Sequence, residues 1–461
     1  MAVRTAVESN MNSDSAGEHA LPPGPSIALF QTLQVLRNPY GYYAKMAAKY
    51  GRIFTVPALN GVVVLGTTPQ AAKDIFTAEA DTFDVFAVGA IKPILGDYSL
   101  IAVSGETHRK QRKLVMPPFH GARMRAYGEA MREVALQRTE GWREGMSIRV
   151  HETTRDISLD VILRTVFGVE GAEVKSMGAL MTRVMDEFNP VLIFSTALQK
   201  SWFPPYRRYL AARAEYGDML RVLIRRCRDD QAREGAPMRT DILSMFVAAR
   251  HDDDSPMSDE EIRDQLQTLL VAGHETTAIS LAWSLYWLHA HPAKLAKLRA
   301  ELDALGPDAS PDELAKLPYL DAVCLETLRL HPIVPDVIRK LNKPLVMDGH
   351  LIPAGLNVGI VTSVIHQDPV LYPNPTSFEP ERWLTKRPTP FEYMPFGGGH
   401  RRCIGSAYSD YEMRIVLATL VARFDLALDG EDAPVRRNIV MGPKHGVRMK
   451  VLGRRESSLA A

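Results

Sequence analysis

Hydrophobic residues follow two different periods along the chain, and the change of period separates a helical majority from short strand-forming stretches. Between residues 50 and 67, two apolar runs flank Asn60-Gly61, a pair typical of the turn in a β-hairpin. Helical spacing dominates residues 105–330. A second strand-rich stretch with turn residues covers residues 344–360. The pattern therefore predicts a mainly α protein with a minor β region.

One predicted helix is long enough to cross most of a globular protein. Ser258 and Glu261 have the spacing of a capping box, and the helix should continue until Pro292. At 1.5 Å per residue, a helix of over 30 residues measures about 48 Å. Gly273 and two threonines in its middle are poor helix formers, which indicates that space is needed there.

Composition narrows the class of protein without identifying it. The 461 residues are 46% hydrophobic, enough for a sizeable core, and Lys+Arg (55) balances Asp+Glu (54). This balance gives no general attraction to nucleic acid or acidic lipid. No linker or charge block interrupts the chain, so we expect a single domain over residues 1–461.

Cysteine usage and the N-terminus indicate a cytoplasmic protein. Cys227, Cys324 and Cys403 are the only cysteines, and they fit neither a disulfide framework nor a zinc site. The first 20 residues are polar, lack the apolar core of a signal peptide and are expected to be disordered. We expect no membrane span, because the first apolar stretch falls well short of ~20 residues.

Residues 396–405 carry the strongest chemical signal. Cys403 follows three consecutive glycines and two arginines, and a helix is predicted after it. Arginines and a helix N-terminus both lower the pKa of a thiol, and glycines let a backbone approach a flat partner. These features predict a thiolate that could ligate haem iron. The alternative is an inert cysteine in an ordinary glycine turn.

This segment resembles the haem-binding loop of the cytochrome P450 family, Phe-x-x-Gly-x-Arg-x-Cys-x-Gly, with every specified position matched. The resemblance implies the cytochrome P450 fold, with the long central helix over the haem. It also implies haem b as the cofactor and Cys403 as the axial ligand of its iron. Phe396, Gly397 and Gly405 would form the loop against the haem.

The weakened part of the central helix, residues 272–277, resembles the family's Ala/Gly-Gly-x-Asp/Glu-Thr motif. The resemblance implies that Ala272 lies against the haem and that Glu275 and Thr276 form an acid–alcohol pair. Thr276 would steady dioxygen during its reduction, and Glu275 would help to deliver protons from water. From the residues alone, a polar stripe with a packing glycine explains the segment equally well.

Glu326 and Arg329 form a Glu-x-x-Arg pair among apolar helical residues. Such pairs usually lie on surfaces and contribute little, but the apolar flanks here indicate burial. The segment resembles the family's Glu-x-x-Arg motif, and the region around Arg382 resembles its partner motif. The resemblance implies a buried ion network of Glu326, Arg329 and Arg382.

His108 and Arg112 share one face of a predicted helix. They resemble a family motif that binds the haem propionates, and Arg339 and Arg401 match further propionate-binding positions. The neighbouring cations admit two interpretations, a solvated basic face or a docking patch for an acidic electron donor: Arg109, Lys110, Lys113 and Arg402.

By resemblance, the substrate contacts come from apolar stretches that could equally be plain core. The expected contacts are Phe83, Phe86, Val88, Ile91, Phe194, Val337 and Val440. They suit a lipophilic small molecule, whether from lipid oxidation or from secondary metabolism.

The best interpretation is a soluble, monomeric haem-thiolate monooxygenase that hydroxylates or epoxidises this substrate with one oxygen atom from O2. Its electrons would come from a separate ferredoxin and ferredoxin reductase fed by NAD(P)H. A peroxygenase, a rearranging haem enzyme and a haem sensor are the rivals, and the Glu275-Thr276 pair argues against them.

Overall fold

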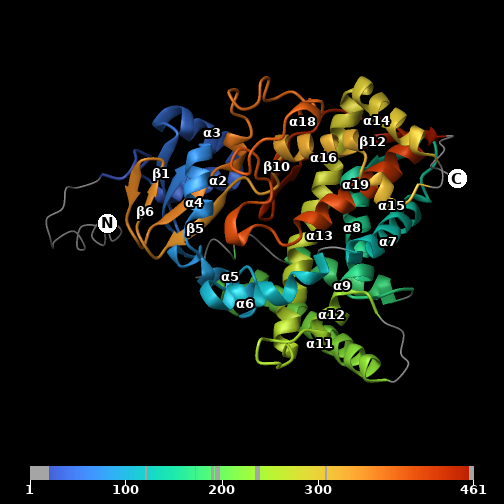
Figure 1. Cartoon of the computed structure of the whole chain (residues 1–461), viewed down its shortest axis with the longest axis horizontal. Coiled ribbons are helices and arrows are strands. Elements are labelled where there is room, and N and C mark those ends of the chain that lie inside the picture. The colour runs from blue at the N-terminus through green and yellow to red at the C-terminus, as the bar shows by residue number, and fades with distance from the viewer. Residues whose placement is uncertain are drawn as a thin grey trace.

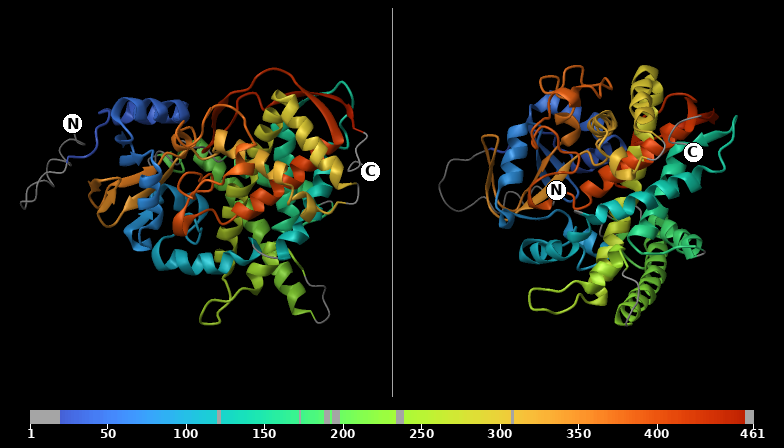
Figure 2. Two further views of the ribbon diagram at one scale, coloured as in Figure 1. Left: turned by 45° about the horizontal axis from the view of Figure 1, so that its top comes forward. Right: turned by 45° about the vertical axis from the view of Figure 1, so that its right-hand side comes forward.

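Helices form most of the molecule, as predicted, and a sheet-rich part lies to one side of them (Figure 1). The long helix α13 (Asp259–Ala290) runs between the two parts, and Figure 2 shows the same division from two further directions. The computed structural model describes residues 20–119, 122–171, 173–187, 192, 198–233, 239–306 and 309–455.

The helices other than α13 are α2 (Ala28–Arg37), α3 (Pro39–Tyr50), α4 (Pro69–Thr77), α5 (Val88–Leu95), α6 (Gly105–Val115), α7 (Ala122–Thr139), α8 (Val150–Thr165), α9 (Glu173–Glu187), α11 (Pro204–Ala232), α12 (Ile242–Ala248), α14 (Pro292–Leu305), α15 (Pro311–Leu314), α16 (Pro318–Leu330), α17 (Thr362–Ile365), α18 (Arg382–Thr385) and α19 (Ser406–Arg423). Within the described ranges, none of the helices combines the length and the apolar content needed to cross a lipid bilayer.

The largest sheet has the strand order β1-β2-β8-β5-β3. Its strands are β1 (Ile53–Ala58), β2 (Gly61–Gly66), β3 (Phe83–Val85), β5 (Val337–Leu341) and β8 (Asn357–Ile360). The predicted hairpin at Asn60-Gly61 joins β1 to β2, with Ala58 opposite Gly61. Strand β8, from the predicted second β region, pairs in parallel with β2 and so brings the two regions together.

The remaining strands form small sheets. They are β4 (Ser147–Arg149) with β12 (Arg448–Arg454) and β9 (Phe424–Leu428), β6 (Leu345–Met347) with β7 (His350–Ile352), and β10 (Pro434–Arg437) with β11 (Val440–Pro443). The sequence did not predict β3, β4, β5 or the strands after residue 423. These strands are short, and most of their partners lie far away in the chain, so local periodicity could not reveal them.

Helix α13 begins and ends where the sequence predicted. The Ser258 side chain accepts a hydrogen bond from the Glu261 backbone at 3.2 Å, and the Glu261 carboxylate accepts one from the Ser258 backbone at 2.8 Å. The helix is buried among α8, α11, α16 and α19. This packing stabilises it despite the weak helix formers at its centre.

Polar side chains on the first half of α13 hold the end of α5 and the segment after it in place. The Gln267 amide donates to the carbonyl of Ile94 at 2.8 Å, and the Asp264 carboxylate accepts from the Tyr98 backbone at 3.1 Å. Both side chains are buried. Because buried polar groups need partners, these bonds fix the segment that forms one wall of the large cavity described next.

Candidate active site

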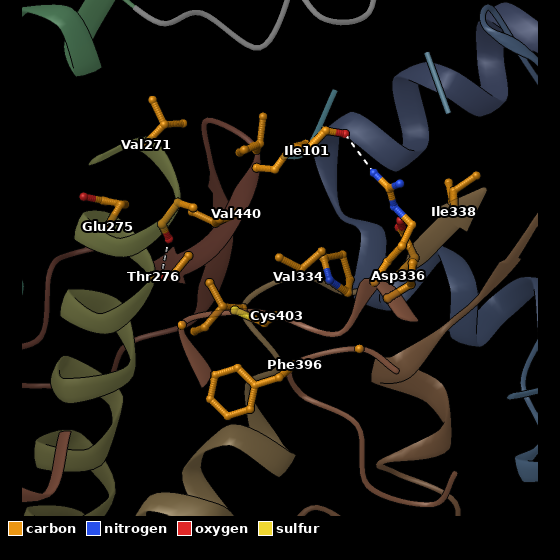
Figure 3. Close-up of a pocket in the computed structure, with 18 of the residues that line it drawn as sticks. Ile101, Val271, Glu275, Thr276, Val334, Asp336, Ile338, Phe396, Cys403 and Val440 are labelled. Atoms are coloured by element: carbon orange, nitrogen blue, oxygen red, sulfur yellow. Dashed lines mark hydrogen bonds between the residues drawn. The ribbon is translucent and has the colours of Figure 1, made fainter. Parts of the chain in front are cut away.

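A cavity of about 1030 Å³ lies between the middle of α13 and the cysteine loop of residues 396–405. Its other walls come from the segment after α5, from β5 and from the turn before β11. Figure 3 shows Glu275 and Thr276 on α13, with Cys403 and Phe396 on the loop. The structure thus brings the two strongest sequence motifs, more than 100 residues apart, to one cavity.

Cys403 is the one cysteine that lines this cavity in the described part of the chain, since Cys227 and Cys324 are buried in the core. Its backbone N–H donates to the carbonyl of Phe396 at 3.0 Å, which closes the loop on itself. Helix α19 starts three residues later, at Ser406. The thiol is exposed to the cavity although protein surrounds the loop.

The predicted low pKa of this thiol is wrong for the protein chain alone. Burial raises the pKa of Cys403, and this effect outweighs the lowering by the Gly405 backbone N–H, Arg112 and Arg402. The arginines are present, as the sequence suggested, but desolvation is the larger cause. A cation bound at the sulfur would reverse the balance, because a metal-coordinating thiol is deprotonated outright.

The three glycines before Cys403 serve two purposes rather than one. A Cβ on Gly398 would lie 2.2 Å from the Phe76 ring, and one on Gly399 would lie 2.5 Å from the Phe76 carbonyl oxygen. These two glycines therefore admit α4 against the loop. Gly397 has a φ of +66° and lines the cavity, so it fits the predicted approach of a flat partner.

Four predicted propionate ligands meet at one side of the cavity: His108, Arg112, Arg339 and Arg401. Within the described chain, none of them lies within ion-pair distance of a carboxylate. Burial is the largest cause of a lowered pKa in each of them, and neighbouring cations lower it further. The pKa of His108 falls to about 3, and that of Arg339 to about 10.

Arg339 shows most clearly that this cluster lacks an anion. Its side chain is buried, and one nitrogen donates to the carbonyl of Gly398 at 3.0 Å. The other two guanidinium nitrogens have no hydrogen-bond partner among the described residues. Arg401, by contrast, donates to the carbonyls of Val103 at 2.9 Å and Ile101 at 3.1 Å. Two carboxylates placed here would satisfy the buried donors.

On α13, the two predicted catalytic side chains have different partners. The Thr276 hydroxyl faces the cavity and donates to the carbonyl of Ala272 at 2.7 Å. The Glu275 carboxylate lies 3.1 Å from the Nε2 atom of His151, on α8. Burial raises the pKa of Glu275. His151 and other neighbouring basic side chains lower that pKa by more, so the net shift is downward.

The sequence did not identify His151 as a residue of the site. The tetrapeptide His-Glu-Thr-Thr occurs at residues 151–154 and again at residues 274–277, which a search for repeats would have found. Nothing in that repeat says that the two copies lie side by side. The contact depends on the packing of α8 against α13, a tertiary feature.

The predicted ion network is present in the structure. Arg329 donates to both Glu326 oxygens at 2.8 Å, and Arg382 donates to one of them at 3.1 Å. Glu326 and Arg329 are fully buried. Two further donors to Glu326 were not foreseen, the indole of Trp383 at 2.9 Å and the backbone of Glu379 at 2.9 Å.

The residues predicted to contact substrate divide into three groups. Phe86, Ile91, Val337 and Val440 line the cavity. Phe83 and Val88 do not line the cavity. Phe83 is buried in the sheet instead, beside the Arg339 guanidinium. Phe194 lies outside the described residues. Further apolar side chains complete the wall: Ile94, Leu100, Val271, Ile333, Val334 and Ile338.

The whole chain, including this site, is similar to proteins of one known family. A family model described as Cytochrome P450 matches residues 21–449. Cytochrome P450 135B1 of Mycobacterium tuberculosis is 34% identical over 445 residues, which cover 95% of this chain and 93% of the relative. Cytochrome P450 138 of the same species is 33% identical over 449 residues, which cover 93% and 96%.

Among solved structures, a cyanobacterial CYP120A1 with retinoic acid bound superposes with a TM-score of 0.84 at 27% identity. The match covers 94% of this chain and 99% of that one. The similarity therefore extends over the helices, the sheets and the cysteine loop together.

Proposed function

Because the chain belongs to the cytochrome P450 family, and is thus a haem-thiolate monooxygenase, we propose that it inserts one oxygen atom from O2 into a lipophilic small molecule. The product would be an alcohol or an epoxide. One observation carries the proposal: a cavity of about 1030 Å³ joins the Cys403 thiol, the Thr276 hydroxyl and a largely apolar wall. The entire chain would act as one P450 domain.

The residues present fit haem b. Cys403 would ligate the iron, and Phe396, Gly397, Gly405 and Ala272 would lie against the ring. The unsatisfied donors of Arg339, together with His108, Arg112 and Arg401, would bind the two propionates. Haem, when bound, supplies the iron at which dioxygen is reduced and activated.

Thr276 and Glu275 would hold and deliver protons at this centre. The Thr276 hydroxyl can exchange its bond to the Ala272 carbonyl for one to a group in the cavity, and so hold a proton at its oxygen. The Glu275 carboxylate lines the same cavity and would pass protons into it. The apolar wall limits water near the reacting atoms and orients a lipophilic substrate.

The nature of the substrate and of the electron donor also belongs to the proposal. Retinoic acid, bound in the cyanobacterial structure, is a lipophile, which supports a substrate from lipid oxidation or secondary metabolism. A cytoplasmic, monomeric enzyme would receive its electrons from a ferredoxin and its NAD(P)H-fed reductase. Ion pairs of Arg109 with Glu106 and of Lys113 with Asp252 leave the docking patch less basic than the sequence suggests.

The test begins with the carbon monoxide difference spectrum of the reduced protein. We expect a strongly red-shifted Soret band in the wild type and its loss in Cys403→Ser. With ferredoxin and reductase, Thr276→Ala should divert most NADPH electrons from product to hydrogen peroxide. Thr277→Ala is the matched control, because the Thr277 hydroxyl lies 3.1 Å from Ser409. Unchanged coupling in Thr276→Ala would refute the role given to Thr276.

A further inference from the structure

A second cavity, of about 490 Å³, lies beside the first and has a quite different lining. Its wall is almost entirely charged or polar, and it consists of Arg149, His151, Glu152, Arg155, Asp156, Arg437, Lys444, His445, Gly446 and Arg448. Several of these side chains are exposed at the protein surface, including Lys444 and His445. We call this space the polar cavity. A cavity with such a lining suits water rather than a lipophile.

The His151–Glu275 pair lies where the two cavities meet. His151 lines only the polar cavity, whereas Glu275 lines only the large cavity, and their nearest side-chain atoms are 3.1 Å apart. Arg155 and Arg437 line both cavities. The imidazole and the carboxylate are therefore the contact between a polar space with exposed side chains and the space above Cys403.

The charges around this contact favour an ionised Glu275. From α8, His151 and Arg155 face it, and from α13, His274 does so; all three lower the pKa of Glu275. Glu152 and Asp156 of α8 add negative charge to the polar cavity, while Asp186 of α9 pairs with Arg155 at 3.4 Å. From the C-terminal strands and turns come three cations, Arg437, Lys444 and Arg448, together with His445.

His274 cannot easily replace His151 as a partner in proton transfer. It is almost fully buried, and neither ring nitrogen has a hydrogen-bond partner in the described part of the chain. Burial lowers its pKa to about 4. The Nε2 atom of His151 also makes no hydrogen bond of good geometry in the described chain, but it lies 3.1 Å from Oε1 of Glu275, and its ring lines the polar cavity.

We propose that the polar cavity is the entrance for the protons consumed in the reaction and that His151 relays them to Glu275. This inference rests on the proposed function. Protonated His151 gives its Nε2 proton to Oε1 of Glu275, which leaves a neutral imidazole and a neutral carboxylic acid. Glu275 releases that proton into the large cavity and returns to the carboxylate. Rotation of the ring turns the vacant Nε2 toward the polar cavity, where it takes its next proton from water, so charge and protons balance.

The decisive variant is His151→Gln, which keeps a hydrogen-bonding side chain but cannot carry a proton. We expect product formation to fall ~10-fold, which is less than the ~100-fold minimum typical of a positioned acid–base group, since water can replace part of the relay. The solvent deuterium isotope effect should rise. Glu275→Gln combined with His151→Gln should be no worse than the more affected single variant, because residues that act as one unit are not additive.

Infrared spectroscopy of the Glu275 carboxyl provides a second measurement that does not require turnover. In the resting enzyme, the wild-type Glu275 carboxyl should show no infrared band of a protonated acid at neutral pH. In His151→Gln, burial is opposed by fewer cations, so such a band should appear, and it should vanish when Glu275→Gln is added. His350→Gln is the matched control, since His350 is exposed on β7 and lines neither cavity, and it should behave like the wild type.

Lys444→Trp provides a second variant if His151→Gln does not fold. Lys444 is an exposed residue of the polar cavity, and a bulky side chain there should slow product formation while His151 and Glu275 keep their contact.

The inference is overturned if His151→Gln gains the infrared band yet keeps wild-type product formation, coupling and isotope effect, and the proposed function then stands. A wild type without a red-shifted carbon monoxide band or coupled turnover removes the proposed function and this inference with it.

Discussion

Two groups of charged side chains in this protein differ in whether the protein itself supplies the opposite charge. The first group is the Glu326 network, in which protein donors satisfy both carboxylate oxygens: Arg329, Arg382, Trp383 and the Glu379 backbone. The remaining Arg329 donors bond to the carbonyls of His366, Pro375 and Ser377. This network is complete without any ligand.

The second group is the propionate cluster of His108, Arg112, Arg339 and Arg401. Here cations lie near one another, their pKa values fall, and Arg339 keeps two buried nitrogens without partners among the described residues. The difference teaches what each group is for. A buried network whose charges are all paired makes the fold depend on every partner, since removing one leaves a buried charge unpaired, whereas buried like charges without an anion indicate a site that a ligand completes.

The largest effect should come from breaking the complete network. Glu326→Ala leaves Arg329 buried without its carboxylate, and we expect a loss of about 3–5 kcal/mol in the free energy of unfolding. Denaturant titration of the haem-loaded protein measures it. Arg109→Ala, which breaks an exposed pair with Glu106, is the control and should change stability within experimental error. Equal losses in both variants would contradict the special role of the buried network.

An intermediate effect should come from the incomplete cluster. Replacing haem by its dimethyl ester removes the two propionate charges, and we expect binding to weaken by about 2–3 kcal/mol, or roughly 30- to 150-fold in Kd. Competition for apoprotein measures this. Arg339→Leu should reduce the preference for haem over the ester.

Lys340→Leu, an exposed cation next to Arg339 on β5, should keep that preference in full. If the wild type bound haem and its ester equally well, the four cations would not be propionate ligands.

The smallest effect concerns a third way of tolerating a buried charge, which is to keep it protonated. Glu412, on α19, is buried, and burial raises its pKa from 4.5 to about 8. Between pH 4.5 and about 8, folding therefore takes up a proton at Glu412. The contribution of protonated Glu412 to stability is complete below pH 4.5 and is lost as pH rises through 8. Between pH 6 and 8 the wild type should lose about 2 kcal/mol relative to Glu412→Gln.

Chemical denaturation of both proteins across this pH range tests the expectation, with Glu144→Gln, at an exposed position, as a control for an added amide. Parallel pH profiles for the wild type and Glu412→Gln would show that Glu412 ionises normally.

The sequence by itself determined the local elements and the identities of the reacting groups. The capping box of α13, the hairpin at Asn60-Gly61 and the cysteine loop depend on neighbours within a few residues, so short patterns suffice to predict them. The pairing of Glu326 with Arg329 is equally local, because three residues along a helix place both side chains on one face.

Only the tertiary structure decided what those groups contact. His151 and Glu275 are 124 positions apart, which hides their contact from any local pattern, and the same holds for β8 beside β2 and for Phe76 against the glycines. The pKa of Cys403 was misjudged for the same reason, since the nearby arginines are visible in the sequence but desolvation is not. Burial is a property of the packed chain, and it sets the sign of the electrostatics at this site.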